Sequence, residues 1–228
     1  MFASGRRPLD RDGLRLKLRG TCASLDGVSV APADVSGAPD PGKQVNAASE
    51  ASAGVPVGVP GHVPAGVPAA VLIGVVPHPE GPGIILTERT AHLANHAAEI
   101  SLPGGRVEAS DRGPAAAALR EAFEEIGLDP GKVELLGCLS PHPTVSGFQV
   151  HPFVGWIEPP VVLTPDRREV ADIFEVPLDF ILDPANHQRD SLTVDGVSRE
   201  FYVLSYPGHR IWGATAGILV SLAKALTS

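Results

Sequence analysis

Apolar and polar positions alternate from Ala69 onward with the periods of strands and helices. Four apolar runs predict buried strands, at residues 69–76, 84–89, 133–140 and 150–157. A helical period governs residues 114–127, where Pro114 suits the first turn and Gly127 suits the end of a helix. The pattern therefore predicts an α/β arrangement.

The C-terminal part continues this alternation. Residues 168–183 predict one or two short helical turns, broken at Pro177. Residues 191–206 predict a hairpin around Asp195-Gly196, because this dipeptide favours a tight two-residue turn. Residues 213–226 predict a closing amphipathic helix. Residues 67–228 are interpreted as one folded domain.

The segment before this domain has a different composition. Residues 31–66 are mostly Ala, Gly, Pro, Ser and Val, which favours extended or disordered chain over a packed core. Residues 9–20 form a short helical pattern with Leu14 and Leu18 on one side. We interpret residues 1–66 as a flexible extension and linker, and expect its deletion to leave thermal stability and kcat nearly unchanged.

Charge and cysteine content restrict the function. The formal charge of −8 argues against nucleic acid as a partner. The two cysteines, Cys22 and Cys138, provide neither a disulfide framework nor a thiolate metal site, which favours a reducing, cytoplasmic location. No membrane span is expected, because the apolar stretch 55–76 is interrupted by Pro56, Pro60, Pro64 and Pro68.

The helix predicted at residues 114–127 carries an unusual group of acids. Its period places Leu119, Phe123 and Ile126 on the packing face, and the acids on the other side. Like charges three and four positions apart cost a few tenths of a kcal/mol per pair, which a cation between the carboxylates would offset. The cluster is therefore either a solvated acidic face or a metal site, formed by Glu121, Glu124 and Glu125.

A glycine pair upstream favours the second alternative. Gly104-Gly105 lies between a strand and the helix, where a backbone without Cβ atoms can approach a metal or a phosphate. Gly105, Asp111 and the run REAFEEIGL from Arg120 onward resemble the signature of the Nudix hydrolases. That signature has glutamate at the aspartate position and one residue fewer before the arginine. Both departures are features of the coenzyme A pyrophosphatase branch of the family.

The preceding stretch, LTERTAHLANHAAEISLPGG at residues 86–105, is also similar to this branch. It retains Leu86, Thr87, Arg89, Leu93, His96, Pro103, Gly104 and Gly105. It departs from the branch at Ala94, Ala98, Glu99 and Leu102, where the branch has arginine, glycine, glutamine and phenylalanine. The resemblance extends over about residues 69–226.

The resemblance implies a Nudix fold, a mixed β-sheet between α-helices, and a Mg2+ or Mn2+ cofactor. It implies that catalysis rests on Glu121, Glu124, Glu125 and Arg120. The implied metal ligands are these three glutamates, the Gly105 carbonyl and Asp111, which alternatively holds the loop. Hard divalent cations suit oxygen ligands, and they neutralise the oxygens of a diphosphate. Three candidates for the general base remain open: Glu121, Glu99 and Glu169.

The expected substrate-binding residues are Arg89, His96, Gly104, Gly105 and Phe148. Arg89 is suited to a phosphate or is a surface charge at the end of a strand, and Phe148 forms either a wall for an adenine or pantetheine group or part of the core. His142 and His151 flank a loop that either borders the pocket or is an ordinary polar loop.

The expected reaction is hydrolysis of the diphosphate of coenzyme A or its derivatives. The alternatives are another nucleoside diphosphate derivative, such as ADP-ribose, NADH or a dinucleotide, and a ligand-binding Nudix domain without turnover. The complete REAFEE set argues against the last alternative. We expect a small nucleotide-derived partner and no nucleic acid or membrane, with a homodimer left open.

Overall fold

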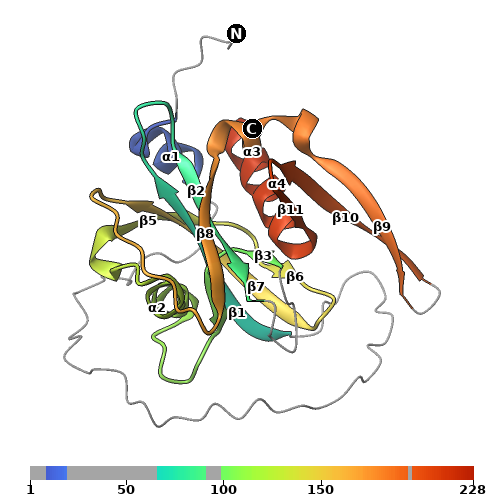
Figure 1. Ribbon diagram of the computed structural model, residues 1–228, viewed down its shortest axis with the longest axis horizontal. Helices are drawn as coiled ribbons and strands as arrows, with labels where there is room; N and C mark the ends of the chain where they lie inside the picture. The colour runs from blue at the N-terminus through green and yellow to red at the C-terminus, as the bar shows by residue number, and fades with distance from the viewer. Residues whose placement is uncertain (1–8, 20–65, 91–98, 195–196) are drawn as a thin grey trace.

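An eight-stranded mixed sheet forms the centre of the fold (Figure 1). A computed structural model of the chain describes residues 9–19, 66–90, 99–194 and 197–228. The parallel pair β1·β7 lies at the middle of the strand order β3-β2-β1-β7-β5, and β4, β6 and β8 are attached to β1, β7 and β2. The strands are β1 (Val67–Val76), β2 (Gly83–Arg89), β3 (Ile100–Ser101), β4 (Gly104–Arg106), β5 (Val133–Cys138), β6 (His142–Pro143), β7 (Phe148–Ile157) and β8 (Val170–Pro177).

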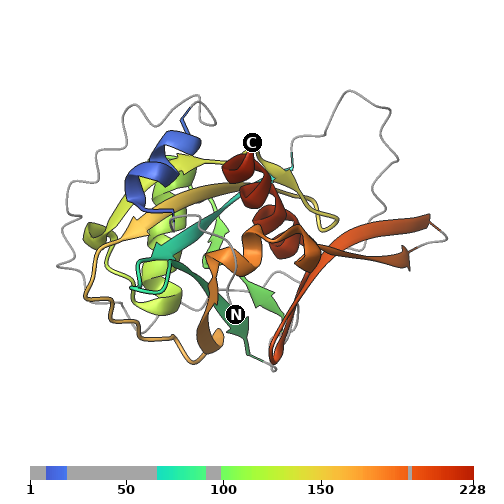
Figure 2. The same ribbon diagram turned by 90° about the horizontal axis from the view of Figure 1, so that it is seen from above.

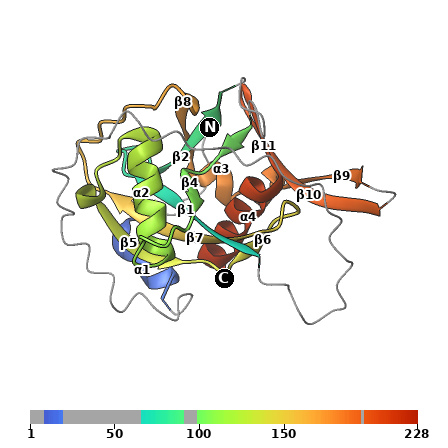
Figure 3. The same cartoon turned by 90° about the horizontal axis from the view of Figure 1, so that it is seen from below.

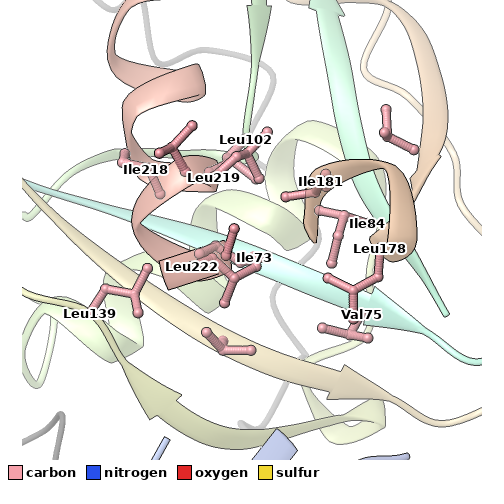
Figure 4. Close-up of a cluster of buried hydrophobic side chains, with 14 of the residues drawn as sticks. Ile73, Val75, Ile84, Leu102, Leu139, Leu178, Ile181, Ile218, Leu219 and Leu222 are labelled. Carbon is pink, nitrogen blue, oxygen red and sulfur yellow. The ribbon is translucent and has the colours of Figure 1, made fainter. Parts of the chain in front are cut away.

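Helices cover both faces of this sheet. Helix α2 (Pro114–Ile126) packs on one face, while α3 (Leu178–Leu182) and α4 (Gly213–Thr227) pack on the other (Figure 3). Figure 4 shows the core on the α4 side, where Ile73 of β1 lies close to Leu222 of α4. This arrangement confirms the prediction of a mixed sheet between helices. Two short 3-10 helices, η1 (Pro130–Lys132) and η2 (Pro184–Asn186), complete the connections.

A second, three-stranded sheet carries the hairpin. Its order is β11-β10-β9, with β9 (Gln188–Val194), β10 (Val197–Tyr206) and β11 (His209–Trp212). Figure 2 shows β9 and β10 extending away from the main sheet. The predicted strands are confirmed, whereas the turn at residues 195–196 lies outside the described residues. The closing helix is confirmed as α4.

The prediction for residues 168–183 is partly wrong. Residues 170–177 form β8, an edge strand whose Phe174 and Val176 pair with Leu86 and Ile84 of β2. The helical part begins only after Pro177, which occupies the N-cap position of α3. Pairing with a buried strand overrides the weak local helical pattern in this segment.

The N-terminal helix α1 (Arg11–Lys17) belongs to the folded unit. Asp10 caps it by accepting the Gly13 N–H at 2.8 Å, and Leu14 and Leu18 are buried in the core. The interpretation of residues 1–66 as one unpacked extension is therefore wrong for residues 11–18. Because deletion of residues 1–65 would remove both leucines from the core, we now expect that deletion to lower stability.

Cys138, the last residue of β5, is disulfide-bonded. The other cysteine of the chain, Cys22, lies outside the described residues. The low cysteine count was one reason to expect a reducing environment, and the bonded Cys138 removes that support. Within the described residues, no helix is long and apolar enough to span a membrane.

Candidate active site

Helix α2 approaches the sheet through small side chains. It begins after Gly113 and ends at Gly127, whose φ of 66° lies in the left-handed region that favours glycine. Alanines at positions 115, 118 and 122 are buried against the sheet. The buried face of α2 therefore differs from the predicted one. Phe123, which was predicted to pack against the sheet, is 45% exposed, whereas Glu125, which was predicted to lie on the other side, is only 5% exposed. The predictions for these two side chains were wrong.

Glu125 is the buried acid of the site. Its Oε2 accepts the Gly104 N–H at 3.0 Å, and its Oε1 lies 3.7 Å from Nη1 of Arg89. Burial raises the pKa of the Glu125 carboxyl to about 7, and repulsion by Glu121 acts in the same direction. The Gly104 hydrogen bond and Arg89 only partly offset this rise. A cation beside Glu125 would stabilise its charged form.

Arg120 links the loop to the helix. Its Nε and Nη2 donate to both carboxylate oxygens of Asp111, at 3.0 and 3.1 Å. These hydrogen bonds hold the pKa of Asp111 below its usual value. Asp111 also accepts the Glu108 N–H at 2.8 Å. Asp111 thus fixes the loop and Arg120, one of the two roles expected for it.

The same guanidinium contacts two of the predicted metal ligands. Nη1 of Arg120 donates to Glu121 at 3.1 Å and to Glu124 at 3.0 Å. The Glu121 carboxylate lies against Gly105, where a β-carbon would collide with it. Burial raises the pKa of Glu121, and Arg120 opposes the rise. Gly105 therefore provides the space that this carboxylate occupies.

The loop before β8 brings a further acid to the site. Thr164 and Asp166 donate their N–H groups to the carbonyls of Ile126 and Glu125, at 2.8 and 2.9 Å, which satisfies the end of α2. The Glu169 carbonyl accepts the N–H of Thr90 at 2.9 Å.

The position of Glu169 has an electrostatic consequence. The charge of Glu169 raises the pKa of both Glu121 and Glu125, so its carboxylate lies near theirs. Loop and helix together place three acids at one end of the sheet. No spacing rule connects residue 169 to the helix, so only the tertiary structure reveals this proximity.

These residues fit a divalent cation in their chemistry. The donors are hard oxygens, one carboxylate is buried with a raised pKa, and Gly105 leaves room for another. Among the described residues, no three acidic, histidine or cysteine side chains already converge on one point. Arg120 is the cation that neutralises Glu121 and Glu124, and it contacts one carboxylate oxygen of each, Oε1 of Glu121 and Oε2 of Glu124.

The predicted substrate residues are separated by the sheet. Phe148 and His142 lie on its α4 side, and a β-carbon at Gly217 of α4 would approach Cε1 of His142 to 2.7 Å. His151 pairs with Ala70, which belongs to the core on the α2 side. Burial lowers the pKa of both histidines. His96 lies outside the described residues.

A buried carboxylate beside a glycine turn, with further acids on one helix, provides hard oxygen donors that suit a divalent cation. The chain belongs to the Nudix family, because the model of the NUDIX domain matches residues 68–195. It is a pyrophosphohydrolase, and Nudix hydrolases generally use divalent metal ions.

Similar proteins of known sequence support this membership. The "Uncharacterized Nudix hydrolase NudL" of Escherichia coli O7:K1 is 41% identical over 153 residues, which cover 67% of this chain and 79% of the relative. The protein of the same name from Escherichia coli K12 has the same identity and coverage. Both relatives agree with the family resemblance read from residues 86–128.

Solved structures with a related fold are more distant. A Nudix hydrolase from M. smegmatis, RenU, is 24% identical and covers 49% of this chain and 70% of its own, with a TM-score of 0.43. The NUDIX domain of Shewanella oneidensis NrtR, complexed with ADP ribose, is 18% identical and covers 53% and 78%, with a TM-score of 0.42.

Proposed function

We propose that this chain hydrolyses the diphosphate of coenzyme A and its derivatives, giving 3′-phosphoadenosine 5′-phosphate and 4′-phosphopantetheine or its acyl form. One observation carries this proposal. Arg89, near the start of the coenzyme A-like stretch 86–105, lies 3.7 Å from Glu125, and Gly104 at its end donates to the same carboxylate. The stretch that resembles the branch is therefore attached to the buried acid of the site.

The metal-binding residues in this proposal are Glu121, Glu124, Glu125 and the Gly105 carbonyl. Mg2+ or Mn2+, when bound, neutralises diphosphate oxygens and makes water a stronger acid. Asp111 holds Arg120, and Arg120 positions the side chains of Glu121 and Glu124. Arg89 is directed by Glu125 toward the anion, and its Nε has no hydrogen-bond partner among the described residues.

Glu169 is the general base that we favour among the three candidates. Glu121 is engaged by Arg120, which donates to its carboxylate at 3.1 Å. The Glu169 side chain is exposed, and it has no hydrogen bond or ion pair to another described residue. Its carboxylate is thus available, close to the other acids, to accept the proton of the attacking water.

Replacement of this base gives a direct test. We expect Glu169→Gln to lower kcat by about 100-fold or more, with the fold retained. The measurement is kcat at saturating Mg2+, with thermal unfolding as the check on the fold. A variant with wild-type kcat would return the assignment to Glu121 or Glu99.

Substrate profiling tests the proposed reaction. The purified protein is incubated with Mg2+ or Mn2+ and separately with coenzyme A, ADP-ribose, NADH and a dinucleotide, and products are identified by mass. We expect 3′-phosphoadenosine 5′-phosphate from coenzyme A. Turnover of ADP-ribose without cleavage of coenzyme A would favour the alternative substrate class. Binding without turnover of any of these compounds would favour a ligand-binding domain. The comparison of substrates is important because this chain has Ala94 where the coenzyme A branch has arginine.

A further inference from the structure

Arg106 lies across the sheet on the side opposite the acids. In β4 it pairs with Ala69, which belongs to the core on the α4 side, whereas the preceding Gly105 pairs with Ala70 on the α2 side. Successive residues of a strand point to opposite faces. The side chain of Arg106 therefore leaves the strand away from Glu121.

An aromatic ring supports this guanidinium. Phe148 is the first residue of β7 and pairs with Val67 of β1. Strand β1 therefore lies between β4, which carries Arg106, and β7, which carries Phe148. The Arg106 guanidinium carbon is 5.2 Å from the centroid of the Phe148 ring. A guanidinium placed over a ring keeps its N–H edges available to other acceptors.

The backbone of Arg106 is attached to the catalytic cluster. Its carbonyl accepts Nη2 of Arg120 at 3.1 Å, and Arg120 also contacts Glu121 and Glu124. The Cα atoms of Gly105 and Arg106 are about 3.8 Å apart, as across any trans peptide. The Arg106 side chain lies on the other face of β4, so a ligand with its diphosphate at Gly105 contacts this side chain only by passing around the strand.

Arg106 differs from Arg89 and Arg120 because no acid among the described residues neutralises it. Arg89 faces Glu125, and Arg120 is held by Asp111. Within the described part of the chain, Arg106 has no ion pair, and its side chain is exposed. A protein of net charge −8 has an uncompensated cation here, next to a site for anions.

We propose that Arg106, supported by Phe148, binds the 3′-phosphate on the adenosine half of the substrate. This inference rests on the proposed function and adds its specificity residue. In the proposed function, the acids on the α2 side bind the diphosphate. A cation on the other face of the sheet therefore contacts a different group of the ligand. A phosphomonoester is a dianion whose oxygens suit the N–H edges of a guanidinium.

The test compares ligands that differ only in this phosphate. The variants are Arg106→Gln, Arg106→Lys and a control, Arg112→Gln, which removes an exposed arginine without an ion pair among the described residues. Calorimetry measures the Kd of adenosine 3′,5′-bisphosphate and of AMP, and assays measure kcat/KM for coenzyme A and dephospho-coenzyme A at one salt concentration. Thermal unfolding of each variant checks the fold.

We expect Arg106→Gln to weaken adenosine 3′,5′-bisphosphate and to lower kcat/KM for coenzyme A by about ten- to a hundredfold, with little change for AMP and dephospho-coenzyme A. Arg106→Lys should retain part of the preference, and Arg112→Gln all of it. Equal losses for ligands with and without the 3′-phosphate overturn the proposal, as does wild-type protein without a preference.

The failure of the proposed function has a different signature. Wild-type protein that cleaves ADP-ribose but neither coenzyme A nor dephospho-coenzyme A would remove the proposed reaction. The binding measurement would still decide the role of Arg106, because it needs no turnover. A preference for adenosine 3′,5′-bisphosphate that disappears in Arg106→Gln, is reduced in Arg106→Lys and persists in Arg112→Gln would support the contact even then.

Discussion

The two helices that enclose the main sheet bury different kinds of side chain. Helix α4 buries large aliphatic residues, among them Ile218, Leu219 and Leu222. Helix α2 buries mostly alanines, together with the carboxyl group of Glu125. Aliphatic burial stabilises a fold by roughly 1.5–3 kcal/mol per side chain, whereas a buried carboxylate lowers stability unless it is paired. The α4 side therefore supplies packing energy, and the α2 side uses a destabilising group for chemistry.

The largest expected effect separates function from packing on the α2 side. Glu125→Gln keeps the size of the side chain but removes the charge that we propose binds the metal. We expect kcat/KM to fall by at least about 100-fold, since a metal ion contributes several kcal/mol of charge stabilisation. The variant should remain folded. Glu80→Gln, which changes an exposed acid in the turn before β2, is the control and should retain activity.

The corresponding change on the α4 side should affect stability instead. Leu219 is fully buried, so Leu219→Ala should lower the free energy of unfolding by about 2–5 kcal/mol. The control is Leu192→Ala, because Leu192 is 53% exposed and should contribute little. Denaturant unfolding measures both. A loss for Leu219→Ala no greater than that for Leu192→Ala would contradict the assignment of packing energy to α4.

The pH dependence of stability sharpens the comparison. The folded-state pKa of Glu125, about 7, lies above its ordinary value of 4.5. Its contribution to stability is fully present below pH 4.5 and is lost as the pH rises through 7. With EDTA present, the Tm of the wild-type protein should therefore fall relative to that of Glu125→Gln between pH 5 and 8. The corresponding loss in the free energy of unfolding is a few kcal/mol. Parallel Tm curves for the two proteins would show that Glu125 is already compensated.

The smallest expected effect concerns Phe123. The helical period assigns it to the packing face, but the structure leaves it 45% exposed. We expect Phe123→Ser to change the free energy of unfolding by no more than about 0.5 kcal/mol. Denaturant unfolding against wild type measures this difference. A loss of several kcal/mol would instead support the prediction that Phe123 lies on the packing face of the helix.

Several elements were predictable because their signals are local. The strands at β1, β2, β5 and β7, the caps of α2 and the closing helix follow from runs of apolar residues and from Pro and Gly positions. The resemblance of residues 86–128 to the family is likewise a property of ordered spacing, and the match to residues 68–195 confirms it. Such signals extend over a few turns of chain, where sequence distance approximates spatial distance.

β8, the packing of α1 and the faces of α2 depended on partners far away in the sequence. The segment of β8 forms a strand because it pairs with β2, and Leu14 is buried because it packs in the core against the sheet. A helical period defines which residues share a face but not how large the neighbouring side chains are. The close approach through alanines therefore buries Glu125 and exposes Phe123.

The sequence by itself determined the acids of the site, the glycine turn and the family. Only the tertiary structure decided what each acid contacts: Glu125 with Gly104, Asp111 with Arg120, and Glu169 near the helix. The physical reason is that pKa values and hydrogen bonds depend on burial and on separations of a few ångströms. These quantities arise when strands and loops distant in sequence meet at one end of the sheet.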